Sequence, residues 1–275
     1  MNKLDHYSPS QLLRPMAVWM FQYLYMTKDQ RREIKVGYNA AFGTAVHGAI
    51  QAMLTIGADF DEAIDSAYLS FDFHDAPATE PQEKRDKYRE LIPDAVEQGI
   101  DLLAERFGGA EEEHKIEVSL DGVELPVIGY IDLCTSDAFC EVKTKAPRMG
   151  AIKKDGTRGW TKAALPAKPQ FEHLCQVAIY QKATGLEPHL AYVSATGGVI
   201  FTPDNCEELQ PEYLAYCLEE MRGRAIRRQN LMKVSDDPKV LAGLLDPDFQ
   251  HPFYWDEEHK EEAKELWSNA TLYER

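Results

Sequence analysis

Apolar residues recur at helical spacing in several stretches of the chain. The stretch 44–56 shows this most clearly, since its apolar residues include Ala45, Val46, Ala49, Ile50 and Met53. Similar patterns predict helices over 8–26, 61–71, 83–107, 169–184 and 207–230. Pro93 is expected to kink or divide the helix over 83–107, and the glycine-flanked segment 37–43 is expected to be a break.

A strand-like pattern replaces the helical one after Gly108-Gly109. β-Branched and aromatic residues, separated by short polar turns, predict antiparallel strands over 115–120, 123–134 and 139–145. Shorter strands are expected over 189–194 and 199–202. The glycine- and proline-rich segment 148–168 is expected to be a mobile loop, and 246–275 to form irregular segments and one last helix. This order of elements predicts a mixed α/β fold.

Composition narrows the classes of protein that the pattern allows. The chain has 275 residues, of which 44% are hydrophobic and 28% charged, as in ordinary globular proteins. A net charge of −16 excludes a protein that coats nucleic acid with a uniformly basic surface. The segment 143–168 nevertheless carries eight basic residues and one acid. A second possible phosphate-binding surface lies between Met221 and Val234, where no acid separates Arg222, Arg224, Arg227, Arg228 and Lys233.

Cysteine usage and the apolar runs indicate a cytoplasmic protein. The five cysteines contain no C-x-x-C pair, which argues against a disulfide framework and against a zinc site made of cysteines alone. The apolar stretch 16–26 is shorter than the roughly 20 residues of a membrane span. It also lacks a cleavage site of small residues. We therefore expect no membrane partner.

Three charged residues stand out in the predicted strands. Asp132 ends one strand, and Glu141 and Lys143 share a face of the next because side chains alternate along a strand. If the turn at 136–137 joins the two strands, Asp132 lies opposite the other two. Carboxylates suit Mg²⁺ or Mn²⁺, and a nearby lysine can orient or deprotonate a water and offset charge on a phosphate. The trio predicts a phosphodiester-cleaving site.

The alternative is that Glu141 and Lys143 form a solvated charge pair on an exposed strand. Against this, Phe139, Cys140 and Val142 make the strand too apolar to be exposed on both faces.

The two motifs, Gly-Tyr-Ile-Asp132 and Glu141-Val-Lys143, resemble the bipartite signature of the PD-(D/E)XK nuclease superfamily. Gly-Thr-Ala-Val-His47 upstream, and Gln176 with Tyr180 downstream, make the chain similar to the RecB-like branch, which includes CRISPR-associated and phage exonucleases. The Ser-Pro-Ser-Gln-Leu12 opening fits that branch too. The resemblance covers about residues 8–202 and implies a restriction-endonuclease-like core, a mixed central sheet flanked by helices with a helical N-terminal portion.

The resemblance also implies roles for individual residues. His47, Asp132, Glu141 and the backbone carbonyl of Val142 would hold the metal ion, and Lys143 would be the catalytic lysine. The alternative for His47 is a satisfied buried side chain on an apolar helix. Residue type alone favours that alternative, but the motif around His47 favours the ligand.

Further residues are expected to contact DNA or to support the site. Gln176 and Tyr180 are four residues apart and share a helix face, which touches DNA, supports the site or merely packs on the sheet. The basic residues expected to attract phosphate are Lys145, Arg148, Lys153, Lys154 and Arg158. Trp160 is a candidate for stacking on a base or wedging a duplex end. Glu117 is a candidate for joining the site behind or beside the metal ligands.

One departure from the branch bears on the cofactor. Some RecB-like nucleases hold an iron–sulfur cluster through one cysteine before the histidine motif and three near the C-terminus. This chain has no cysteine in 13–16, and Cys206 and Cys217 lack the tight spacing of such a cluster. We therefore expect Mg²⁺ or Mn²⁺ and no iron–sulfur cluster.

These observations lead to a specific hypothesis. The chain is expected to be one nuclease domain over 1–275, with a helical part (1–110), a core (111–202) and a C-terminal part (203–275). It would be a metal-dependent DNA exonuclease releasing 5′-phosphate products, in recombination, repair or degradation of DNA in a bacterial or phage-infected cell. The alternatives are a structure-specific endonuclease acting on flaps or branches, and a non-catalytic DNA-binding module. Because the acidic surface weakens non-specific binding, efficient cleavage is expected to need a DNA end, single- or double-stranded, a homo-oligomeric ring or a recombination partner protein.

Overall fold

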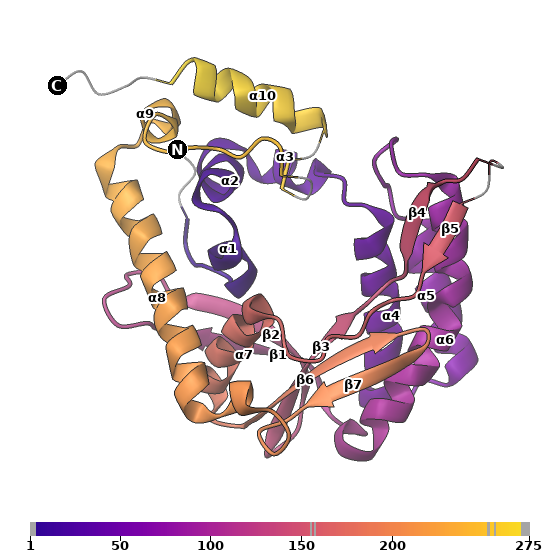
Figure 1. Cartoon of the computed structure of the whole chain (residues 1–275). Coiled ribbons are helices and arrows are strands. Elements are labelled where there is room, and N and C mark those ends of the chain that lie inside the picture. The colour runs from indigo at the N-terminus through magenta and orange to yellow at the C-terminus, as the bar shows by residue number, and fades with distance from the viewer. Residues whose placement is uncertain (1–3, 155, 157, 252–253, 256, 271–275) are drawn as a thin grey trace. The chain divides into compact units, whose positions relative to one another are not determined.

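The chain divides into two compact units, each made of segments distant in sequence (Figure 1). The computed structural model describes residues 4–154, 156, 158–251, 254–255 and 257–270. Unit 1 comprises Met1–Lys35, Glu117–Gly129 and Ala215–Arg275, and unit 2 comprises Val36–Ile116 and Tyr130–Leu214. These units cut across the predicted parts, because most of 1–110 belongs with the core. A single nuclease domain over the whole chain stays a prediction.

A five-stranded mixed sheet organises unit 2. Its strand order is β1-β2-β3-β6-β7, and the strands are β1 (Glu111–Val118), β2 (Val127–Cys134), β3 (Ala138–Thr144), β6 (Glu187–Ser194) and β7 (Gly197–Phe201). β2 pairs with β3, and β6 with β7, in antiparallel fashion, whereas β3 and β6 are parallel. The predicted mixed α/β class is confirmed. The central strand β3 has neighbours on both sides.

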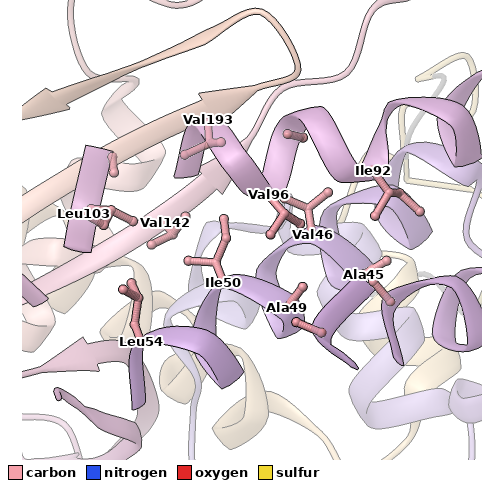
Figure 2. Close-up of a cluster of buried hydrophobic side chains, with 14 of the residues drawn as sticks. Ala45, Val46, Ala49, Ile50, Leu54, Ile92, Val96, Leu103, Val142 and Val193 are labelled. Atoms are coloured by element: carbon pink, nitrogen blue, oxygen red, sulfur yellow. The ribbon is translucent and has the colours of Figure 1, made fainter. Parts of the chain in front are cut away.

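Three helices pack over one face of this sheet. They are α4 (Tyr38–Thr55), α5 (Phe60–Asp72) and α6 (Gln82–Phe107). Two of them, α4 and α6, lie directly on the strands, and the third, α5, packs against these two helices. Figure 2 shows Ile50 of α4 between side chains of α6 and of the strands, Val142 among them. Gly99 allows the close approach of α6 to α4, because a Cβ atom there would lie 2.2 Å from Ile50 Cδ1. This packing fixes α4, which carries His47, against the sheet.

Of two predictions about these helices, one is wrong and the other is partly wrong. The segment 37–43 is not a break, because α4 already begins at Tyr38 after an N-cap at Gly37. Its apolar residues Ala41 and Phe42 are buried in the core, and tertiary packing of this kind outweighs the low helix propensity of glycine. The helix is not divided at Pro93, since α6 is continuous from Gln82 to Phe107, and the alternative of a kink at Pro93 stays a prediction.

The opposite face of β3 carries α7 (Phe171–Thr184). Cys140 and Val142 belong to the core beneath α4 and α6, so the alternate residues of β3 point the other way. On that side the ring of Phe139 meets the ring of Tyr180 of α7, with centroids 6.1 Å apart. Glu141 and Lys143 share this face.

The predicted mobile loop over 148–168 is instead partly a β-hairpin. Its strands are β4 (Arg148–Ile152) and β5 (Arg158–Thr161), and residues 155 and 157 lie outside the described part. Gly150 and Gly159 face each other so closely that a Cβ on Gly150 would lie 3.0 Å from the Gly159 carbonyl oxygen. Glycines that suggest a loop from sequence are therefore strand residues here. The hairpin is anchored by Trp160, whose ring centroid lies 6.1 Å from that of Tyr88.

Helices make up most of unit 1. They are α1 (Pro9–Leu13), α2 (Met16–Met20), the π-helix η1 (Phe21–Tyr25), α3 (Lys28–Glu33), most of α8 (Pro211–Val234), α9 (Pro238–Ala242) and α10 (Glu257–Ser268); the short 3₁₀ turn η2 (Glu207–Leu209) belongs to unit 2. The predicted helix 8–26 is interrupted because Arg14 is extended, the conformation that a following proline imposes. The expected last helix is confirmed as α10. Among the described helices, none combines the length and the apolar character that crossing a bilayer requires.

On α8, the structure excludes Arg228 from the expected phosphate-binding surface because its side chain is buried, and phosphate binding by the other basic residues of α8 stays a prediction. Arg228 is only 2% exposed and lies within unit 1. Its Nη atoms donate to the carbonyl oxygens of Gln11, Arg14 and Arg224. The remaining contacts join Arg222 to Glu219, Arg224 to the Leu13 carbonyl and Lys233 to Glu124.

Candidate active site

Asp132 lies where β2 and β3 separate. The paired residues are Leu133 with Cys140 and Cys134 with Phe139. Beyond them, the Val142 N–H donates to Asp132 Oδ2 at 2.7 Å. In an extended strand, the carbonyl of a residue points to the same side as its N–H, so the Val142 carbonyl is directed toward Asp132 as well. The predicted hairpin thus brings Asp132 beside the Glu141–Lys143 strand.

Glu141 is a buried carboxyl group, 2% exposed. One oxygen, Oε1, accepts a hydrogen bond from Lys143 Nζ, while Oε2 is buried and has no hydrogen-bond partner among the described residues. Burial, together with the negative charge of Asp132, raises the Glu141 pKa to about 7, although Lys143 and His47 act in the opposite direction. At Glu141, burial and the charge of Asp132 therefore outweigh the positive charge of Lys143.

Lys143 is held at the centre of a chain of hydrogen bonds. Its Nζ donates to Gln176 Oε1 at 3.0 Å, Gln176 Nε2 donates to the Tyr180 hydroxyl at 2.8 Å, and that hydroxyl donates to the Tyr130 carbonyl at 2.8 Å. Burial lowers the Lys143 pKa, but the carboxylates of Glu141 and Asp132 outweigh it and hold the pKa above its usual value. The ammonium is therefore protonated. Gln176 and Tyr180, predicted to share a helix face, together orient it.

Helix α4 contacts Asp132 through two side chains one turn apart. His47 Nε2 lies 3.3 Å from Asp132 Oδ1. Gln51, four residues further along, donates from Nε2 to the Asp132 carbonyl at 2.8 Å. Gln51 was not predicted from the sequence to belong to the site. It could have been found because it is a polar residue at i+4 from His47 on an otherwise apolar helix face.

The donor types at this point suit a divalent cation. An imidazole, two carboxylates and a carbonyl are ligands that Mg²⁺ or Mn²⁺ accepts, and the buried unpartnered oxygen of Glu141 is the kind of atom that a cation would satisfy. As the side chains stand, no three His, Cys, Asp or Glu groups of the described part are arranged to hold an ion. The Lys143 ammonium contacts Glu141 instead. Binding would therefore require these side chains to reorient.

The other predicted residues lie around this cluster. Lys145 follows Lys143 on the same face, and Arg148 begins β4 with an exposed side chain. Lys153 and Lys154 lie exposed beyond β4 on the hairpin, where Arg158 Nε lies 3.6 Å from Glu83 Oε2. Trp160 is half-buried against α6, and Glu117 is exposed on β1 in unit 1. Their contribution to DNA binding or to the metal site stays a prediction.

A solved structure has a similar fold. A crystal structure of a “putative exonuclease” from Eubacterium rectale matches with a TM-score of 0.51 and 16% sequence identity, over 82% of each chain. A crystal structure of SSO0001 matches over 77% of this chain and 82% of that one, with 14% identity and a TM-score of 0.29, which is too low to indicate a shared fold. No protein-family model and no curated protein matches the sequence. The chain thus shares the mixed α/β fold of the Eubacterium rectale protein.

Proposed function

We propose that the chain is a Mg²⁺- or Mn²⁺-dependent DNA exonuclease that hydrolyses phosphodiester bonds. The observation that carries this proposal is a set of contacts beside the sheet that links three elements. His47 of α4 contacts Asp132 of β2, the Val142 amide of β3 donates to Asp132, and Lys143 donates to Glu141 on β3. The fold shared with the Eubacterium rectale protein supports it. Release of 5′-phosphate products belongs to the same proposal, as does a role in recombination, repair or degradation of DNA.

Each residue has a distinct task in the proposed reaction. His47, Asp132 and Glu141, with the Val142 carbonyl, would hold the ion. The bound ion would supply Lewis-acid stabilisation of charge on the phosphate. Lys143, protonated and oriented by Gln176, would place its ammonium against the phosphate, where negative charge grows as water attacks. Gln51 would hold the backbone at Asp132 in place, and Tyr180 would hold Gln176 and, through it, Lys143.

Two other functions would use the same fold. A structure-specific endonuclease would cut flaps or branches with the same residues, and a non-catalytic module would bind DNA without cutting. Catalysis is favoured over the second, because the buried Oε2 atom of Glu141 has no hydrogen-bond partner among the described residues, which costs stability unless the atom serves a ligand.

Digestion of linear and circular DNA tests the proposal. We expect a linear duplex labelled at a 5′ end or internally to be lost in Mg²⁺ or Mn²⁺ and preserved in EDTA, while a closed circle of the same sequence stays intact. The order in which the labels are released gives the polarity. Cutting of the circle would establish the endonuclease instead, and binding without cleavage of either form under all metals would establish the non-catalytic module.

Metal binding is expected to depend on pH through Glu141. Because its pKa is raised to about 7, the free protein holds Glu141 protonated below that pH, and an ion must displace the proton. Mn²⁺ affinity should rise by roughly tenfold per pH unit up to about pH 7 and then level off. The thermal shift produced by Mn²⁺ between pH 5.5 and 8.5 measures this.

Matched variants show whether the shift comes from the proposed site. Glu141→Gln should remove it, whereas Glu97→Gln, a charge-matched change on the exposed surface of α6, should leave it intact. A Mn²⁺ shift that is independent of pH, or that survives in Glu141→Gln, would place the ion elsewhere. Glu117→Gln shows separately whether Glu117 contributes.

A further inference from the structure

A second polar cluster lies just beyond the end of β3, around Lys145, two residues after Lys143. Lys145 Nζ donates to Gln170 Oε1 at 3.2 Å and lies 5.1 Å from the centroid of the Tyr192 ring. Tyr192 sits on β6 in register with Lys143, so its side chain shares the face that α7 covers. No carboxylate among the described residues pairs with Lys145.

One tautomer of His173 would give this cluster a free donor. The Tyr192 hydroxyl accepts from the Gln170 N–H at 2.9 Å and keeps a proton that it can donate to His173 Nδ1, 2.7 Å away. We assign His173 the tautomer in which Nδ1 accepts this bond and Nε2 carries the proton. Nε2 has no hydrogen-bond partner within the described residues and is not enclosed by them. His173 thus presents an N–H donor that no group of the protein uses.

The charges around His173 favour an anion at this position. Burial, reinforced by Lys143 and Lys145, lowers the His173 pKa to about 3, so the imidazole is a neutral donor at any assay pH. Burial and the positive charges of Lys143 and Arg148 also lower the pKa of Lys145. The positive charges of Lys143, Lys145 and Arg148 therefore repel one another, and an anion bound near Lys145 would relieve that repulsion.

We propose that Lys145 and His173 form a second phosphate-binding site, which holds the phosphate adjacent to the one attacked at Lys143. Residues 143 and 145 are separated by two strand residues, roughly 6.6 Å, a distance comparable with the spacing of successive phosphates on a nucleic-acid strand. The site rests on the proposed function and specifies it. Two neighbouring phosphates of one DNA strand would bind next to each other, one at Lys143 and one at Lys145 and His173. Tyr192 would be the positioning residue for His173.

Neutralising one phosphate at a time tests the site. Oligonucleotides carrying a single methylphosphonate at successive positions are cleaved by the wild type, Lys145→Met and His173→Phe, and kcat/KM is measured for one bond. A neutral group at the adjacent position should lower kcat/KM of the wild type roughly tenfold, as loss of a charge-assisted contact does. In each variant, which already lacks that contact, the same neutral group should lower kcat/KM only slightly further. Several nucleotides away, the substitution should affect all proteins equally. His173→Gln, which can keep an N–H donor, should recover most of the loss.

Binding in EDTA keeps the test independent of cleavage. There, Lys145→Met should lower the slope of log affinity against log salt by about 0.7 to 0.9, the value for one phosphate contact, and His173→Phe, which removes a neutral donor, should lower the affinity without changing the slope. Lys182→Met, on the exposed surface of α7, serves as a charge-matched control. The second site would be overturned if the effect of each protein substitution and the effect of the methylphosphonate were independent at every phosphate position, both in cleavage and in binding. If the protein substitutions and the adjacent methylphosphonate affect binding in EDTA non-independently, but no metal-dependent cleavage occurs, the hydrolase function is overturned and the phosphate site stands.

Discussion

Lys143→Ala is expected to lower kcat by roughly 10²–10³-fold, the range seen when one transition-state donor is removed from an enzyme. The ammonium is half-buried beside Glu141 and Gln176 and is held protonated, and no neighbouring side chain can reproduce its charge. The effect should fall on the chemical step, since negative charge on the phosphate is greatest in the transition state. DNA affinity in EDTA should change far less.

Single-turnover cleavage of an end-labelled duplex measures this effect, and anisotropy in EDTA measures the binding. The matched control is Lys182→Ala, which removes an exposed lysine from α7. Because Lys143→Ala leaves Glu141 without its partner, the thermal stability of the variant is measured beside its activity. A folded Lys143→Ala protein with wild-type activity would refute the assigned role of Lys143 and with it the proposed active site.

Arg228→Ala is expected to lower the stability of unit 1 by about 3–5 kcal/mol, as removal of a buried charged partner does. The guanidinium is the donor to three backbone carbonyls, of Gln11, Arg14 and Arg224, at 3.2, 2.6 and 3.1 Å. It also lies 5.2 Å from the ring of Trp19. Truncation therefore leaves buried oxygens without donors and opens a cavity beside an aromatic ring.

Urea unfolding gives the overall effect, and hydrogen exchange of the amides in α1 and α2 localises it to unit 1. The local measurement is needed because a chain with two units does not have to unfold in one step. Arg227→Ala is the control, since Arg227 is the exposed neighbour on α8 and should change stability by no more than about 0.5 kcal/mol. Equal effects of the two substitutions would show that Arg228 has no structural role beyond that of a surface arginine.

The sequence predicts the short-range part of the candidate site well. Strand alternation and a two-residue turn are local rules, and they correctly place Asp132 opposite Glu141 and Lys143. The i, i+4 relation correctly puts Gln176 and Tyr180 on one face of α7. The same relation, applied to His47, would have found Gln51.

Longer-range features could not be read in this way. Tyr192 reaches the neighbourhood of Lys143 only because β3 and β6 are parallel, and that pairing joins residues about fifty positions apart. Nothing near His173 in sequence announces its partner.

Glycine was the main source of error in the fold. In α4, Gly43 and Gly48 lie inside the helix, where the energy of packing the apolar face exceeds their propensity cost. In the hairpin, Gly150 and Gly159 allow two strands to approach each other. A glycine marks either flexibility or close contact, and only the three-dimensional neighbours distinguish the two.

The bond between Asp132 and the Val142 amide has a consequence for how inactive forms of this protein can be made. The carboxylate takes the place of a missing backbone partner at the point where β2 leaves β3. Asp132 is therefore both a proposed ligand and a member of the sheet's hydrogen-bond pattern. Replacement by alanine would leave a central strand with an unpaired amide, whereas asparagine keeps an acceptor there. Evolution of an inactive relative by loss of this residue would have to repair the sheet as well as discard the chemistry.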